Sequence, residues 1–140
     1  MKKILLAAAA SLALNAHAAE LKQFGEIANA VDNGKQLTIV IKLKQCEADI
    51  PVMDISTAVT PNAMMRVGDK MITASDRHFS LNDPMANGLP TFGYVKYTLL
   101  ADSRASVKVT LMHATDYSKI AEYEIRCQLG EGLSVFDNQK

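Results

Sequence analysis

Hydrophobic and polar residues alternate with a period of two along much of the chain, which is typical of strands with one buried face. The pattern is clearest in four segments, residues 37–44, 94–102, 105–113 and 120–127. The short turn Asp102-Ser103-Arg104 joins the second segment to the third, and short connections of this kind favour antiparallel pairing. The sequence therefore predicts an antiparallel sheet.

One segment near the start of the chain has a helical period instead. Phe24, Ile27, Ala28 and Val31 follow the spacing i, i+3, i+4 and i+7, so residues 20–33 are predicted to form a helix. Gly34 stands where a left-handed cap would end it.

The middle and the end of the chain are less regular. Pro61-Asn62, Gly68-Asp69 and the segment 82–90, which contains Asn-Asp-Pro and Asn-Gly-Leu-Pro, are predicted as turns or loops. Gly130-Glu131-Gly132 breaks the last pattern, and residues 133–140 are expected to form a frayed tail. Between these breaks we expect further strands at residues 52–60, 63–67, 70–75 and 77–81.

These elements predict an α+β, β-rich fold. We expect one N-terminal helix packed on the apolar face of a curled antiparallel sheet, or on a partly closed small barrel, of about six or seven strands. Residues 19–140 are expected to form a single domain.

The first 18 residues have the pattern of a secretory signal peptide. Lys2 and Lys3 precede the apolar run Ile4–Leu14, and Ala16-His17-Ala18 is a small-x-small cleavage site. The apolar run is shorter than the roughly 20 residues needed to span a bilayer, and no longer apolar run follows. We therefore expect cleavage after Ala18 and a periplasmic or secreted protein without a transmembrane segment.

Cleavage also changes the charge balance. The chain has 15 basic and 15 acidic residues, and loss of Lys2 and Lys3 leaves a slightly acidic protein. Because nucleic acids and anionic membranes favour strongly basic surfaces, we do not expect nucleic acid as a partner.

Export changes the interpretation of the two cysteines. In an oxidising compartment, two cysteines in a small domain usually pair, so Cys46 and Cys127 are expected to form one structural disulfide. They lack the close spacing of a catalytic dithiol, and without a matching histidine pair they make a poor zinc site.

The layout of the chain resembles the VirK family of small exported bacterial proteins. The resemblance covers nearly all of residues 19–140 and implies that Ser75–Phe79 and the two cysteines belong to a shared frame. The family takes its name from virulence-associated loci, so the resemblance also implies a virulence context. It supplies no catalytic residue. The features that carry it are Asp32-Asn33-Gly34-Lys35, the strand running into Cys46, Ser75-Asp76-Arg77-His78-Phe79, Tyr94-Val95-Lys96-Tyr97 and Cys127-Gln128-Leu129-Gly130-Glu131-Gly132.

The main polar cluster is Ser75-Asp76-Arg77-His78. A serine hydrolase would need Ser75 beside His78, but on a strand these two side chains point to opposite faces. Asp76 and His78 share a face, and we expect them to hydrogen-bond each other. They are candidate binding residues.

Other candidate binding residues are His113, Met65 and Met71. His78 and His113 could help to hold a metal, although they lack local ligand spacing. The methionines could fill the core, form an adaptable protein-binding surface, or bind Cu(I) through soft thioethers. We expect core packing for most of them and predict no resident metal or cofactor.

The sequence favours a non-enzymatic exported protein that binds a macromolecular partner, either another protein or an envelope component. The alternative is a periplasmic carrier of a small apolar ligand or metal, with a cavity lined by residues such as Leu99, Val109, Tyr97 and the methionines. A third hypothesis, a small hydrolase built on Ser75 and His78, would need a bulge that brings them together.

Overall fold

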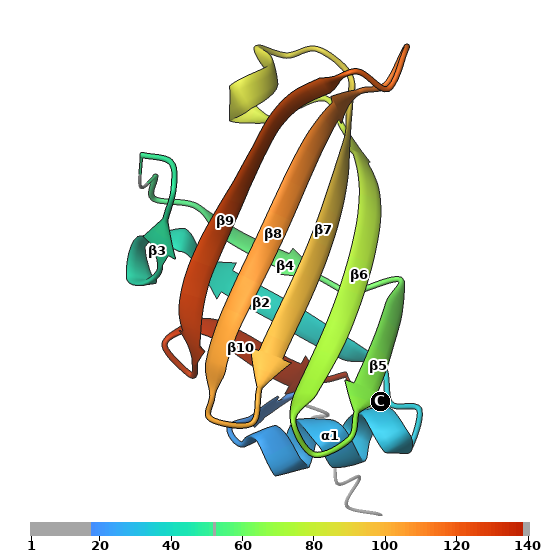
Figure 1. The fold of residues 1–140 in the computed structure, drawn as a ribbon, viewed down its shortest axis with the longest axis vertical. Helices are drawn as coiled ribbons and strands as arrows, with labels where there is room; N and C mark the ends of the chain where they lie inside the picture. Colours follow the sequence, from blue (N-terminus) through green and yellow to red (C-terminus); the bar gives the residue numbers. More distant parts are fainter. Residues whose placement is uncertain (1–17, 52, 139–140) are drawn as a thin grey trace, which may run out of the picture.

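The computed structural model describes residues 18–51 and 53–138, so the predicted signal peptide lies almost wholly outside the described residues. Figure 1 shows a curled sheet with one α-helix at its lower end. Two 3-10 turns, η1 (Leu43–Gln45) and η2 (Pro84–Ala86), lie in connections between strands. In chain order the helix and strands are β1 (Ala19–Leu21), α1 (Phe24–Asp32), β2 (Leu37–Lys42), β3 (Glu47–Ala48), β4 (Ser56–Val59), β5 (Ala63–Val67), β6 (Met71–Ser80), β7 (Thr91–Leu100), β8 (Arg104–His113), β9 (Lys119–Leu129) and β10 (Gly132–Asp137).

The sheet is a half-barrel with eight strands in the order β4-β2-β10-β9-β8-β7-β6-β5, while β1 pairs with β10 and β3 with β9. The long strands β6, β7, β8 and β9 form one wall, here called the long wall. Strands β2, β4 and β10 cross behind it and form the short wall (Figure 1). The predicted β-rich, curled fold with one helix and one disulfide is confirmed, but the number of strands is larger than expected.

The extra strands are short and pair over long distances in sequence. β1 occupies residues expected in the helix, because Glu20 and Leu21 pair with Phe136 and Val135 of β10; the helix itself begins only at Phe24. One pairing, between β10 and β9, is parallel rather than antiparallel. The sheet is therefore mixed, with a single parallel pair among the described strands.

The expectation of a frayed tail was wrong for residues 133–137. These residues form most of β10, whose backbone pairs with β2 on one side and with β9 and β1 on the other. Leu133 and Val135 alternate with more exposed residues and are buried in the core. Backbone pairing on both sides, together with two buried side chains, holds this segment in place.

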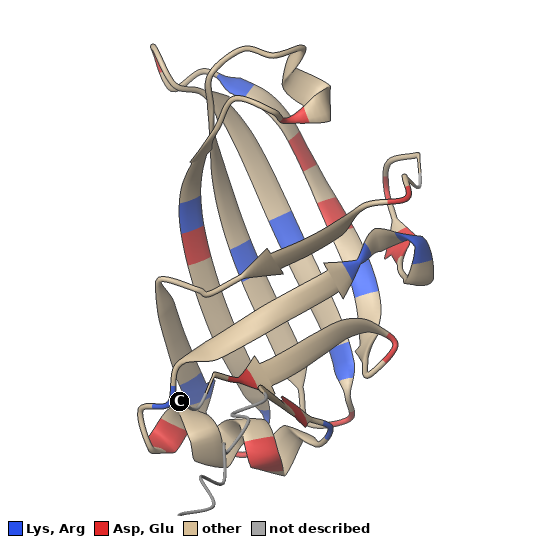
Figure 2. Ribbon diagram, turned by 180° about the vertical axis from the view of Figure 1, so that it is seen from behind, with Lys and Arg blue, Asp and Glu red and all other residues tan. Residues whose placement is uncertain are grey.

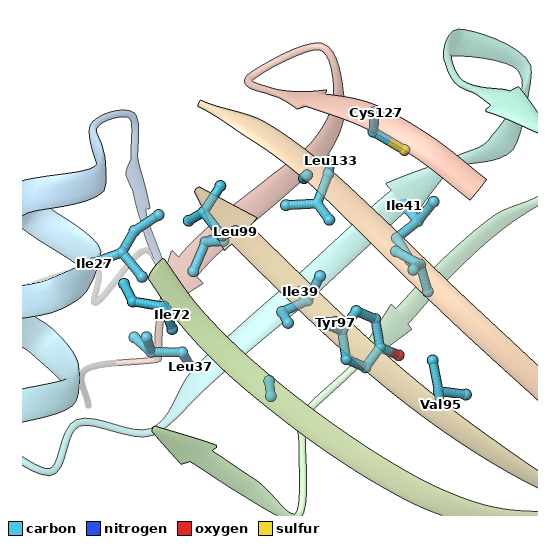
Figure 3. Close-up of a cluster of buried hydrophobic side chains, with 14 of the residues drawn as sticks. Ile27, Leu37, Ile39, Ile41, Ile72, Val95, Tyr97, Leu99, Cys127 and Leu133 are labelled. Carbon is cyan, nitrogen blue, oxygen red and sulfur yellow. The ribbon is translucent and has the colours of Figure 1, made fainter. Parts of the chain in front are cut away.

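Helix α1 closes one end of the half-barrel rather than covering a face of the sheet. Figure 3 shows Ile27 directed from the helix toward Ile72, Leu37 and Leu99, and Ile27 is fully buried. The helix begins with a capping box, in which Glu26 accepts the backbone N–H of Gln23. The apolar stripe predicted from the sequence therefore packs against the end of the core.

The predicted disulfide between Cys46 and Cys127 is present. Cys46 follows η1, and Cys127 belongs to β9, where it lies in the same cross-strand row as Ala105. The bond therefore joins the segment after the short wall to the long wall, close to the helix end of the core.

Charged residues of both signs are dispersed over the strands and the helix (Figure 2). Within the described part of the chain, no helix is long and apolar enough to cross a membrane.

Candidate functional site: a cavity inside the half-barrel

An apolar cavity of about 390 Å³ lies between the two walls. Val95, Val109 and Leu111 line it from the long wall, and Ile41 and Val59 line it from the short wall. Volumes of roughly 300–1,000 Å³ with mostly apolar linings are typical of sites for small molecules.

The cavity exists partly because small residues lie among the inward-facing ones of this region. Cross-strand rows place Val95 beside Val109, and Gly93 beside Leu111, so few side-chain atoms reach the interior at these positions. The helix fills only the opposite end, where Ile27 packs. A half-barrel with short inward side chains and a plug at one end leaves unfilled space at the other.

Asp76 and His78 lie on the inner face of β6 and line the cavity. Oδ2 of Asp76 lies 2.8 Å from Nδ1 of His78, and the side chain of Asp76 is only 5% exposed whereas that of His78 is 52% exposed. With the carboxylate ionised, Nδ1–H of the imidazole donates to it. The hydrogen bond predicted between these residues is therefore present.

A glycine on the facing strand accommodates the close approach of the imidazole. His78 pairs with Gly93 on β7, and a Cβ atom built on Gly93 would lie 2.8 Å from Nε2 of His78. With a Cβ atom this close, the ring of His78 would have to move. The missing side chain of Gly93 therefore leaves the space that the ring occupies over the sheet.

Two tyrosines and a second carboxylate add polar groups to the cavity. Tyr97 and Tyr123 reach it from the long wall, and Asp83 reaches it from the segment before η2. Burial, together with the nearby Asp76 carboxylate, raises the pKa of Tyr97. Burial, with Asp83 as the second cause, raises the pKa of Tyr123 in the same direction.

The raised tyrosine pKa values predict a loss of stability in alkali. The phenol ionises more easily in the unfolded chain, so the stability contributed by Tyr97 is complete below pH about 10 and falls as the pH rises through the folded-state pKa. We expect the free energy of unfolding to fall less steeply above pH about 10 in Tyr97→Phe than in the wild type. Urea unfolding across this range tests the prediction, with both proteins compared at neutral pH to correct for packing. Parallel curves for the two proteins would contradict it.

The comparisons with known proteins identify the family. The sequence model of the VirK protein family matches residues 20–117. The chain belongs to the VirK family. Its fold is similar to the crystal structure of lpg1832, a VirK family protein from Legionella pneumophila, with a TM-score of 0.79 and 44% sequence identity over 84% of this chain and 98% of that chain. It is also 26% identical to uncharacterized protein y4wH of Sinorhizobium fredii (strain NBRC 101917 / NGR234), over 97% of this chain and 93% of the relative.

The structure brings only two of the candidate binding residues of this VirK protein into the cavity, Asp76 and His78. His113 pairs with Thr91 at the end of β8 and does not line it. Met65 is exposed on β5, and Met71 lies at the start of β6 opposite Val67. Among the described residues, no group of three or more His, Cys, Asp or Glu side chains forms a metal-binding arrangement.

Ser75 does not meet His78. The strand β6 is continuous from Met71 to Ser80, so Ser75 is on the outer face, opposite Lys96, while His78 is on the inner face. The bulge that a serine nucleophile would require is not found in β6.

The cavity contains some residues expected from the sequence and others that were missed. Tyr97 and Val109 line it as the carrier hypothesis predicted, but Leu99 does not and belongs to the core cluster instead. The methionines that line it are Met53 and Met85. These come from segments between strands, whose positions a local pattern cannot reveal.

A second feature lies on the outer face of the long wall. Phe92 stacks against Tyr117 with ring centroids 5.8 Å apart and meets the edge of Phe79 at the same distance. The guanidinium of Arg77 lies 5.6 Å from the centre of the Phe92 ring. Phe79 and Tyr117 are 55% and 57% exposed. We call these four residues the outer aromatic cluster.

Proposed function

We propose that this VirK protein is an exported binding protein that carries a small, largely apolar ligand in the cavity between the two walls. The observation that supports this function best is the cavity itself, whose volume and apolar lining suit a small molecule. The outward position of Ser75, away from the imidazole of His78, gives a serine hydrolase no support, so the proposed function is non-enzymatic.

The proposed location is the periplasm or the exterior of the cell. Two observations support it: the signal-like sequence that ends at Ala18 and the disulfide between Cys46 and Cys127. Disulfides persist mainly in oxidising compartments. A carrier in such a compartment would shield an apolar molecule from water.

The test uses N-phenylnaphthylamine, a neutral dye whose emission rises in apolar surroundings. We expect residues 19–140 to bind the dye and Val109→Phe to lose most of that binding, because the added ring fills the cavity that Val109 lines. Thr110→Phe is the matched control, since it adds the same ring at the next position of β8, which faces the other side of the sheet.

Equal binding of the dye to Val109→Phe and to the wild type would show that the dye binds outside the cavity. Absence of dye binding to the wild type would refute the proposed function. Circular dichroism of both variants shows whether each remains folded.

A second candidate function is binding of a macromolecular partner, an envelope protein or another envelope component. The outer aromatic cluster favours it, because exposed aromatic side chains beside an arginine are enriched at protein interfaces. A photo-crosslinking phenylalanine analogue at Phe79 should give an adduct of defined mass in cells. The same analogue at Thr73, on the same strand and face, is the control. Equal adducts at both positions, or none at either, would contradict this function.

A further inference from the structure

We propose that the ligand carried in the cavity is a cationic amphiphile, an apolar molecule with a protonated amine that Asp76 binds. This inference rests on the proposed function and adds the chemical class of the ligand.

The first argument comes from the unused oxygen of Asp76. The side chain is 95% buried, and only Oδ2 has a hydrogen bond to another described residue, namely His78. Among the described residues no fully buried side-chain nitrogen or oxygen lacks a partner, so Oδ1 must be accessible. Because Asp76 lines the cavity, a ligand there can reach this oxygen.

The same reasoning applies to the two tyrosines. Neither Tyr97 nor Tyr123 has a side-chain hydrogen bond to a described residue, yet both line the cavity. Their hydroxyl oxygens are therefore accessible from it and can accept a hydrogen bond. Burial is the main reason why the pKa values of both phenols are raised, and a nearby carboxylate, Asp76 for Tyr97 and Asp83 for Tyr123, acts in the same direction.

The charges around the cavity determine which head group fits. Its described lining contains two carboxylates, Asp76 and Asp83, one imidazole, His78, and no lysine or arginine. A buried carboxylate is costly unless a cation or hydrogen-bond donors compensate it. An ammonium group supplies both, whereas a ligand carboxylate would add a like charge, and an alcohol would add no charge. The apolar remainder of the lining suits an alkyl or aryl body.

The experiment is competition against N-phenylnaphthylamine with three probes that share one alkyl chain: decylamine and decanoate, each below its micelle concentration, and decanol, below its solubility limit. We expect decylamine to displace the dye from the wild type at a concentration about tenfold or more below that of decanol, the range of a charge-assisted hydrogen bond. Decanoate should be the weakest competitor.

The variant Asp76→Asn keeps the shape of the side chain and removes its charge, so the advantage of decylamine over decanol should disappear while decanol competes as before. Asp102→Asn is the control, because it makes the same change in net charge in the turn between β7 and β8, outside the cavity lining.

Dye displaced equally well by decylamine and decanol in the wild type would overturn the amine assignment and leave the apolar carrier standing. A retained decylamine advantage in Asp76→Asn would overturn the role of Asp76. Failure of the wild type to bind the dye at all would refute the proposed function and the inference with it. The wild-type comparison decides the ligand class even if Asp76→Asn does not fold.

Discussion

Replacing both cysteines by alanine should lower the free energy of unfolding by about 4.5 kcal/mol, because the chain-entropy relation gives this value for a loop of this length. The bond between Cys46 and Cys127 closes a loop with a sequence separation of 81. Domains of this size commonly have net stabilities of about 5–15 kcal/mol. The protein without the bond should therefore remain folded, with only about 0.5–10 kcal/mol of its stability left.

Urea unfolding of the wild type and of Cys46→Ala/Cys127→Ala measures this effect. A reducing agent should move the wild-type curve onto that of the variant and leave the variant unchanged, which separates the loss of the bond from the loss of the sulfur atoms. If the free energy of unfolding of the variant lay within about 1 kcal/mol of that of the oxidised wild type, the unfolded chain would gain little conformational freedom when the disulfide is removed.

Gly132→Ala should lower the free energy of unfolding by about 3 kcal/mol, for two separate reasons. Gly132 has φ +85, a conformation that L side chains rarely adopt. In addition, a Cβ atom there would lie 2.5 Å from Sγ of Cys46 and 2.9 Å from the carbonyl oxygen of Gln45. Because the disulfide fixes the sulfur atom and the second contact is with backbone, neither neighbour can move at low cost.

The matched control is Gly130→Ala, two residues earlier in the same connection. Gly130 has φ +81, but no atom lies within 4 Å of the position of its Cβ, so this variant should lose only about 1–2 kcal/mol for the backbone conformation. The difference between the two variants measures the close approach at Gly132. Equal losses in chemical denaturation would show that Gln45 and Cys46 move away from the added methyl group without cost.

The contact with sulfur can be isolated further. In the background without the disulfide, Sγ of Cys46 is absent, so Gly132→Ala should cost less there than in the wild type. If the added cost of Gly132→Ala were identical in both backgrounds, the steric part would come from the carbonyl of Gln45 alone.

The sequence predicted the long strands because their pattern is local. Val95, Tyr97 and Leu99 alternate with polar or exposed residues in β7, and Val107 and Leu111 do the same in β8. The pairing of Asp76 with His78 was predictable for the same reason, since residues two apart share a face of a strand.

The missed elements depend on partners far away in the sequence. β1 has only three residues, and its pairing with β10 brings Glu20 within hydrogen-bonding distance of Ser134, more than a hundred positions later. β10 begins at the second of two glycines, Gly132, and carries only two buried apolar side chains, which is too short a pattern to distinguish from a tail. In both cases, tertiary pairing determines the strand.

The candidate site divides in the same way. Tyr97 and Val109 could be placed in the interior from alternation alone, whereas Met53, Asp83 and Met85 reach the cavity from irregular segments. Their positions depend on how the chain crosses the open end of the half-barrel. No period in the sequence encodes that path.

The position of the disulfide has a mechanical consequence. Cys127 lies in the cross-strand row nearest the helix, with Leu99 and Ala105, so the bond fixes the spacing of the two walls at that end. Nearer the start of β9, residues 121–123 pair with β8, and among the described residues no backbone ladder joins this part of the long wall to the short wall. The disulfide therefore limits the separation of the two walls beside the helix, whereas at the other end, where the cavity lies, their separation depends on side-chain packing and the connecting segments.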